Sequence, residues 1–232
     1  MSLLSTHQLQ SWYGDFQALY GIDFELHESE AVAVIGSNGA GKSTFLKSLV
    51  GLLKVSSDAV HFEGQPIGGK TPGEIARLGL ALVPEGRRLF PSLSVEENLL
   101  MGASTGRKGP WNLDRLHKLF PILKERRRNP ATALSGGQQQ MVALGRALMS
   151  NPKVLLCDEL SLGLAPVVIH EIYRALPAIC AEGITAVIVE QDVSLAQRAA
   201  QRLYCFQEGR VSLTARSGDV SREQISQAYF GR

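Results

Sequence analysis

The sequence has few cysteines, and their arrangement excludes the usual cysteine chemistry. Only three occur among 232 residues, and no two of them have C-x-x-C spacing. Cys157, Cys180 and Cys205 each stand among apolar residues, so we expect buried, reduced thiols rather than disulfides or metal ligands. The five histidines are scattered without ligand spacing. We therefore expect no metal site built from side chains alone.

The sequence also lacks a long apolar run and a strong net charge. No run approaches the roughly 20 residues that a helix needs to cross a bilayer. Residues 1–10 show neither the basic flank nor the apolar stretch of a signal peptide. The formal charge of +2 gives no reason to expect a nucleic-acid partner. We expect the chain to stay in the cytosol and to reach a membrane only through a partner protein.

The composition does provide a core, since 44% of the residues are hydrophobic. Three short apolar runs, each followed by polar residues, predict buried strands at 31–35, 154–157 and 184–189. Helical spacing of apolar residues predicts helices at 42–53 and 167–181. This alternation is typical of a parallel α/β sheet, in which ligands bind at the carboxyl ends of the strands.

Two other regions differ from this pattern. Residues 94–149 are mostly helical in pattern, which predicts an inserted helical subdomain with helices at 95–101, 112–124 and 136–149. Residues 1–30 show short alternating strands, and 60–63 and 203–214 add more, which predicts an antiparallel or mixed sheet. A short helix is expected at 221–232.

One loop carries the clearest chemistry. It matches G-x-x-x-x-G-K-[ST] at every fixed position, between a predicted strand and a predicted helix. Backbone N–H groups of such a loop surround phosphates at the positive end of the following helix. The expected nucleotide-binding residues are Gly36, Ser37, Asn38, Gly39, Ala40, Gly41, Lys42 and Ser43, with Thr44 adding a phosphate hydrogen bond. Lys42 is expected to reach the β- and γ-phosphates of ATP, and the Ser43 hydroxyl to hold Mg²⁺.

Two carboxylates follow the second apolar strand. Asp158 and Glu159 could serve only to end a strand, but after a phosphate loop they indicate a catalytic role. We expect Asp158 to hold Mg²⁺, which prefers oxygen ligands. Glu159 is then the expected general base for the water that attacks the γ-phosphate.

The segment Leu134-Ser135-Gly136-Gly137-Gln138 has two interpretations. Ser135 with Gln138 three residues later predicts a capping box at a helix start. Two glycines inside a helix end cost roughly 1 kcal/mol each relative to alanine. They are better explained if this helix end approaches a ligand closely, which indicates a second nucleotide contact.

In order and spacing, these three motifs resemble the ATP-binding cassette (ABC) ATPases over essentially the whole chain. The resemblance implies a P-loop NTPase core (1–85 and 150–232) and a helical subdomain (86–149) within one domain, 1–232. It also implies a head-to-tail dimer that holds two ATP molecules. In that dimer the signature residues of one subunit contact ATP bound by the other; these are Ser135, Gly136, Gly137 and Gln138. Tyr13 matches the aromatic residue that stacks on adenine, although Trp12 is a rival and a surface aromatic is the alternative.

Two departures narrow the resemblance. Glu85 stands where the family usually has a glutamine that contacts Mg²⁺ and the attacking water, and a carboxylate still suits the metal. Gln191 stands where a histidine is usual; its amide can donate to the γ-phosphate but cannot carry a proton. Leu160 is a departure of another kind, because it stands where the subfamily named next usually has a proline; we expect a small effect on rate.

With the phrases at 83–91 and 161–166, these departures resemble the ATPase subunits of branched-chain amino acid, urea and amide uptake systems. The implied partners are permease subunits, a second cassette (itself or a paralogue) and, indirectly, a solute-binding protein. The implied location is the cytoplasmic face of the inner or plasma membrane. The alternatives are an ABC ATPase of another transporter class or a soluble ABC protein. The interval between Lys42 and Ser135 leaves no room for the coiled-coil insertion of the DNA-repair class.

Overall fold

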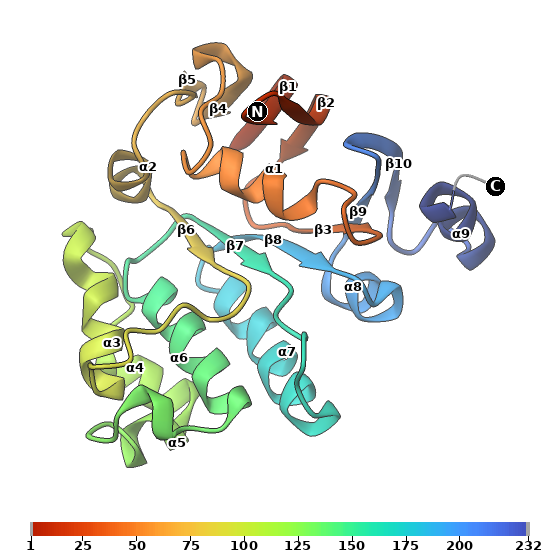
Figure 1. Ribbon diagram of the computed structural model, residues 1–232. Helices are drawn as coiled ribbons and strands as arrows, with labels where there is room; N and C mark the ends of the chain where they lie inside the picture. Colours follow the sequence, from red (N-terminus) through yellow and green to blue (C-terminus); the bar gives the residue numbers. More distant parts are fainter. Residues whose placement is uncertain (1, 231–232) are drawn as a thin grey trace. The chain divides into compact units, whose positions relative to one another are not determined.

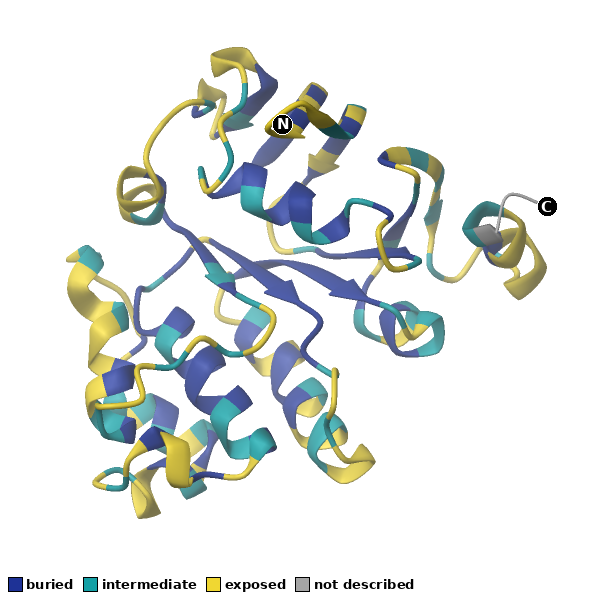
Figure 2. Ribbon diagram, viewed as in Figure 1, coloured by how far each residue is buried: buried dark blue, intermediate teal, exposed yellow. Residues whose placement is uncertain are grey.

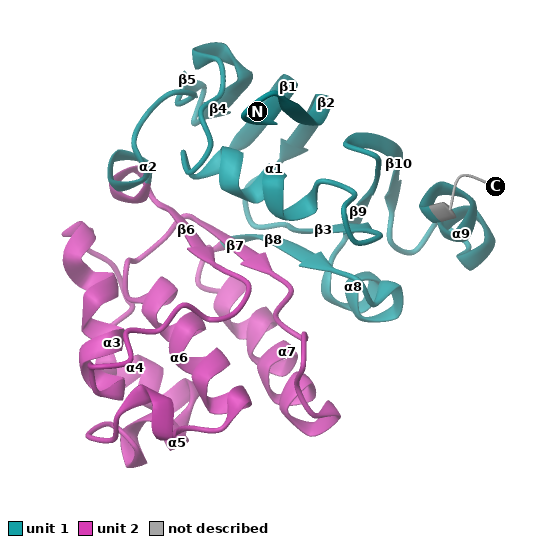
Figure 3. Ribbon diagram, in the orientation of Figure 1, with its two compact units in different colours: residues 1–75, 185–232 teal, residues 76–184 magenta. Residues whose placement is uncertain are grey.

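The computed structural model describes residues 2–230 (Figure 1). Within that range the chain forms two compact units (Figure 3). Unit 1 comprises the residues up to Ile75 and those from Thr185 onward, and unit 2 comprises Ala76–Ile184. The narrower helical subdomain expected at 86–149 falls within the range of unit 2, and its boundaries stay a prediction.

An antiparallel sheet forms the N-terminal part of unit 1. Its strands are β1 (Leu4–Tyr13), β2 (Phe16–Leu26), β4 (Val60–Phe62) and β5 (Gln65–Pro66), in the order β2-β1-β4-β5. The expected short strands are in fact two long ones. Register shifts along β1, near Gln8 with its φ of 45°, interrupt the alternation of buried and exposed side chains. These bulges explain why the sequence pattern indicated shorter pieces.

The second sheet of unit 1 carries the phosphate loop. In it β3 (Ala31–Gly36) is parallel to β8 (Thr185–Glu190) on one side and to β9 (Arg202–Gln207) on the other. Antiparallel β10 (Arg210–Arg216) follows β9, so the strand predicted at 203–214 is a hairpin. Every residue of β3 and β8 is buried, which fits their unbroken apolar sequences (Figure 2).

Three helices of unit 1 flank these strands: α1 (Lys42–Leu49), α8 (Val193–Ala199) and α9 (Arg222–Phe230). The Phe45 ring of α1 packs edge-on against Phe24, with ring centroids 5.1 Å apart, and against Phe206, at 5.3 Å. Helix α1 ends earlier than the predicted 42–53. Gly51 turns the chain with a φ of 73°, and a Cβ there would lie 2.5 Å from the Lys70 carbonyl oxygen. The last two residues of the helix expected at 221–232 lie outside the described residues.

Unit 2 pairs two parallel strands, β6 (Leu80–Val83) and β7 (Val154–Asp158), in the register Leu80↔Val154 to Val83↔Cys157. Its helices are α3 (Val95–Gly102), α4 (Leu113–Leu119), α5 (Pro121–Glu125), α6 (Gly136–Leu148) and α7 (Pro166–Cys180). Helix α2 (Pro72–Leu78) spans the boundary between the units in sequence. Short 3₁₀ turns occupy Ser57–Ala59, Ala103–Thr105 and Ala131–Ala133.

Two expectations for unit 2 need correction. The single helix predicted at 112–124 is two helices, because Phe120 precedes a proline and adopts φ −130°, ψ 84° instead of a helical conformation. Cys180 is half-buried, unlike Cys157 and Cys205, which are buried. None of Cys157, Cys180 and Cys205 forms a disulfide. Between residues 2 and 230, none of the helices combines the length and apolarity that a membrane crossing needs.

Candidate functional site

The loop between β3 and α1 surrounds the Lys42 ammonium group. Lys42 is 4% exposed, and its Nζ donates to the carbonyl oxygens of Gly36 at 2.7 Å and Ser37 at 3.0 Å. The Ala40 N–H bonds the Ser37 carbonyl at 3.1 Å, which closes the turn. The loop therefore holds a buried ammonium, a group that can donate to the oxygens of a polyphosphate.

Two glycines of this loop have different reasons to be glycine. A Cβ on Gly36 would lie 2.3 Å from the Phe206 carbonyl oxygen, so neighbouring strand β9 leaves no room for a side chain. Gly39 has a φ of 82°, and a Cβ there would meet nothing within 4 Å. Open space at the tip of the loop allows another molecule to approach the backbone closely, so the residues present fit a bound nucleotide.

Tyr13 lies beside the first turn of α1. Its hydroxyl is 3.4 Å from the Thr44 hydroxyl, which brings these two predicted nucleotide-binding residues together. Ser48 strengthens the same junction, since its hydroxyl donates to that of Ser11 at 3.1 Å. Tyr13 and Trp12 are almost equally exposed, at 45% and 43%, so exposure does not choose between the two candidates for stacking on adenine. The contact with Thr44 favours Tyr13.

Gln191 also lies in unit 1, directly after the buried strand β8. Its neighbour Asp192 caps helix α8 by accepting the Leu195 N–H at 2.9 Å. This cap determines where the loop ends and the helix begins. Gln191 is therefore held in a short connection between a buried strand and a capped helix, and it lines a cavity described below.

In unit 2 the predicted acidic residues follow the carboxyl ends of two paired strands. Asp158 ends β7, and Glu85 follows β6 by two residues. Because Val83 is in register with Cys157, the residues after both strands leave the sheet at the same edge. Asp158 and Glu159 are only 4% and 9% exposed, whereas Glu85 is exposed. Glu159 has a φ of 50°, a left-handed conformation that is uncommon for a non-glycine residue.

The signature segment forms the start of α6, as the sequence predicts. The Gln138 N–H donates to the Ser135 hydroxyl at 3.3 Å, and the Ser135 N–H donates to the Gln138 side chain at 3.1 Å. This reciprocal pair is the expected capping box. Ser135 is exposed, Gly136 is half-buried and Gly137 is buried.

The structure supplies a packing reason for one signature glycine. A Cβ on Gly137 would lie 2.2 Å from Cγ1 of Val168 in α7. A Cβ on Gly136 would instead meet the end of the Arg87 side chain at 3.0 Å. Close contact between α6 and α7 therefore requires a glycine at 137 whether or not a ligand approaches.

Sequence reasoning missed an arginine that ties the loop after β6 to α6. Arg146 donates to the Arg88 carbonyl at 2.8 Å and to the Arg87 carbonyl at 3.0 Å, and it lies 5.4 Å from the centre of the Phe90 ring. Arg87 in turn lies within 3.4 Å of the Gln139 side-chain oxygen, to which it donates. Burial lowers the pKa of Arg146, though a guanidinium stays charged at neutral pH. No sequence signal marks this anchor, because Arg146 bonds backbone carbonyls that lie 58 and 59 positions away in the chain.

Comparison with known proteins places this arrangement in a family. The family model described as ABC transporter matches residues 19–161. The chain belongs to the ABC transporter family. It is accordingly a nucleotide-binding cassette with ATPase activity.

Full-length relatives agree with this cassette assignment. The chain is 41% identical to the high-affinity branched-chain amino acid transport ATP-binding protein BraG of Pseudomonas aeruginosa, over 99% of this chain and 100% of that protein. It is 30% identical to the probable branched-chain amino acid transport ATP-binding protein LivG of Methanocaldococcus jannaschii, over 100% and 98% of the two chains. A crystal structure of a nucleotide-free ATP-binding cassette from an ABC transporter matches with a TM-score of 0.82 and 29% identity, over 98% and 95% of the two chains. The α/β cassette fold is therefore confirmed.

Proposed function

We propose that this cassette is the ATP-hydrolysing subunit of a membrane importer for branched-chain amino acids or related small solutes such as urea and amides. The full-length similarity to BraG carries the proposal, since that relative is named for branched-chain amino acid transport. Glu85 and Gln191, which depart from the usual cassette pattern, support the same subfamily.

The phosphate loop binds the ATP in this proposal. Its backbone N–H groups and the buried Lys42 ammonium neutralise the β- and γ-phosphates. Tyr13 stacks on the adenine, and Thr44 adds a hydrogen bond to a phosphate. Mg²⁺, when bound, offsets phosphate charge; oxygen atoms of Ser43, Asp158 and Glu85 suit it as ligands.

Hydrolysis of ATP then depends on three side chains. Glu159 accepts a proton from the water that attacks the γ-phosphate. Its uncommon backbone conformation and near-complete burial fit a residue held for a specific geometry. Gln191 donates an amide hydrogen bond to the γ-phosphate, and Glu85 orients the attacking water.

The working form in this proposal contains two cassettes, self-paired or paired with a paralogue. Ser135, Gly136, Gly137 and Gln138 of one cassette contact the ATP held by the other, and closure of the pair drives two permease subunits. A solute-binding protein delivers the solute on the far side of the membrane. The cassette is then peripheral, at the cytoplasmic face of the inner or plasma membrane.

Two experiments test this function. When the chain is purified from native membranes, two permease subunits should remain bound to it. If the working form pairs two different cassettes, the second cassette should also remain bound. In cells that lack the gene, complementation should restore uptake of labelled leucine. Lys42→Ala should abolish that uptake, while Lys47→Ala, which removes a charge from the same helix, should preserve it. Leucine uptake that is independent of the gene would refute the proposed solute class.

A further inference from the structure

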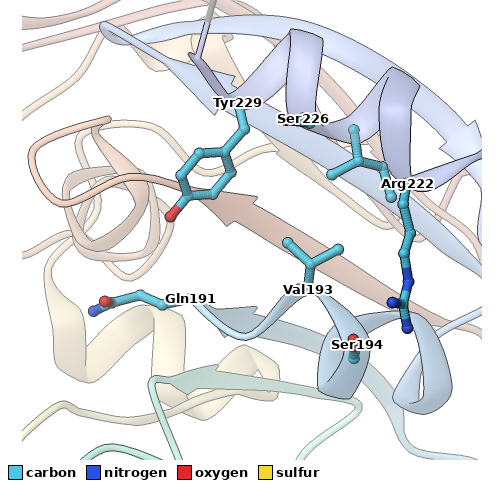
Figure 4. Close-up of a pocket in the computed structure, with 7 residues that line it drawn as sticks. Gln191, Val193, Ser194, Arg222, Ser226 and Tyr229 are labelled. Atoms are coloured by element: carbon cyan, nitrogen blue, oxygen red, sulfur yellow. The ribbon is translucent and has the colours of Figure 1, made fainter.

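A cavity of about 390 Å³ lies within unit 1 between the start of α8 and helix α9 (Figure 4). Its described lining residues are Gln191, Val193, Ser194, Arg222, Ile225, Ser226 and Tyr229. This volume is at the lower end of the range of small-molecule sites, roughly 300–1,000 Å³. The cavity is therefore large enough for a small organic molecule.

The walls of this cavity are fixed by contacts outside it. The Ser221 and Gln224 side chains cap the start of α9, with bonds of 3.2 and 2.9 Å to each other's N–H groups. The Ser212 hydroxyl of β10 donates to the Ala228 carbonyl at 2.9 Å, which ties the helix to the sheet. Ile225 is 2% exposed, so its packing also holds α9 in place. These contacts hold helix α9, and with it one wall of the cavity, against β10.

Polar groups lie at both ends of the cavity, and two aliphatic side chains also line it. In Figure 4 the Tyr229 hydroxyl and the Gln191 amide lie toward one end, and the Arg222 guanidinium and Ser194 lie toward the other. Val193 and Ile225 supply aliphatic surface to the lining. Among the described lining residues Arg222 is the only charged side chain, and no carboxylate is present.

The Arg222 side chain is exposed and interacts electrostatically with the neighbouring Glu223 carboxylate. Arg222 is the first residue of α9, and a helix N-terminus favours negative rather than positive side chains. A guanidinium presents paired N–H groups that match a carboxylate. Ser194 lines the same end of the cavity, and its hydroxyl can donate to a carboxylate.

We propose that this cavity binds a small aliphatic carboxylate, with its charge on Arg222 and Ser194 and its alkyl group against Val193 and Ile225. A bound alkyl group reaches toward Gln191 and restrains its side chain. If Gln191 contacts the γ-phosphate, as proposed above, occupancy of the cavity slows ATP hydrolysis. Binding itself does not depend on that role of Gln191.

Isothermal titration of the full chain with 3-methylbutanoate tests the binding. The neutral analogue 3-methylbutanamide should bind more weakly because it lacks the charge. Acetate should also bind several-fold more weakly, because each buried CH₂ group contributes to affinity. Arg222→Gln should lower the affinity for 3-methylbutanoate about twofold to fivefold, since an ion pair with an exposed guanidinium is weakened by solvent.

Arg198→Gln is the matched control, since it removes an exposed arginine from α8 that does not line the cavity. It should leave the affinity unchanged. No measurable binding, or an equal loss in both variants, overturns the site.

ATPase assays test the coupling separately. Saturating 3-methylbutanoate should slow turnover of the unsubstituted chain and leave Arg222→Gln unaffected, with equal basal rates in both. Binding without any change in turnover refutes the coupling to Gln191, whereas the leucine-uptake experiment tests the proposed function independently.

Discussion

Gly137→Ala is expected to destabilise unit 2 through a clash with Val168. The added Cβ would lie 2.2 Å from Cγ1 of Val168, 3.0 Å from its Cγ2 and 3.1 Å from its Cβ. Rotation of Val168 about χ1 cannot relieve the contact with its own Cβ, and a β-branched residue in a helix has one strongly preferred rotamer. The α6 and α7 backbones must therefore move apart.

The magnitude follows from two opposing terms. Overpacking of this kind costs about 1–3 kcal/mol. Replacing glycine by alanine in a helix returns about 1 kcal/mol. The net loss in the free energy of unfolding is thus about 0–2 kcal/mol. Gly136→Ala is the matched control. Its Cβ meets only the far end of the flexible Arg87 side chain, so it should gain about 1 kcal/mol from helix propensity and be more stable than Gly137→Ala.

A double-mutant cycle with Val168→Ala isolates the contact. Urea unfolding followed by circular dichroism should give a coupling energy between positions 137 and 168 of about 1–2 kcal/mol, because the truncated side chain makes room for the new methyl group. Zero coupling, or a Gly137→Ala variant as stable as Gly136→Ala, would refute the packing explanation. ATPase assays test separately whether Gly137 also contacts nucleotide. If it does, the double variant should regain stability, but its rate of ATP hydrolysis should remain low.

Three further outcomes are expected. Glu159→Gln should still bind ATP and accumulate an ATP-bound dimer by light scattering; unchanged turnover would show that Glu159 is not the base. Arg146→Lys should lower the free energy of unfolding by about 1–3 kcal/mol, because a lysine lacks the planar guanidinium that reaches the two loop carbonyls from separate nitrogens and lies over the Phe90 ring. The exposed Arg126→Lys serves as its control, and equal stabilities would contradict the anchor. Burial raises the pKa of the Cys180 thiol, so little of it is thiolate at pH 8. As the pH is raised, the alkylation rate of Cys180 should therefore continue to increase at pH values where the rate for free cysteine has already reached its plateau. An alkylation rate that reaches its plateau at the same pH as free cysteine would contradict this. The Cys180→Ser variant shows which part of the labelling occurs at Cys180.

The phosphate loop could be predicted from the sequence because its determinants are local. A buried apolar strand, a glycine-rich turn and a lysine at the start of a helix are all adjacent in the chain. The capping box at Ser135 is local for the same reason. The bulges of β1 escaped prediction, since register depends on the partner strand. The break at Phe120 was missed although Pro121 marked it.

By itself, the sequence determined the strand–loop–helix around Lys42, the acidic pair after β7 and the family, because each depends on residues close together in the chain. Only the tertiary structure decided why Gly137 must be glycine, which carbonyls Arg146 holds, and that Gln191 shares a cavity with α9. These contacts join residues about 30 or more positions apart. No local pattern encodes them, because they arise only when helices and strands pack.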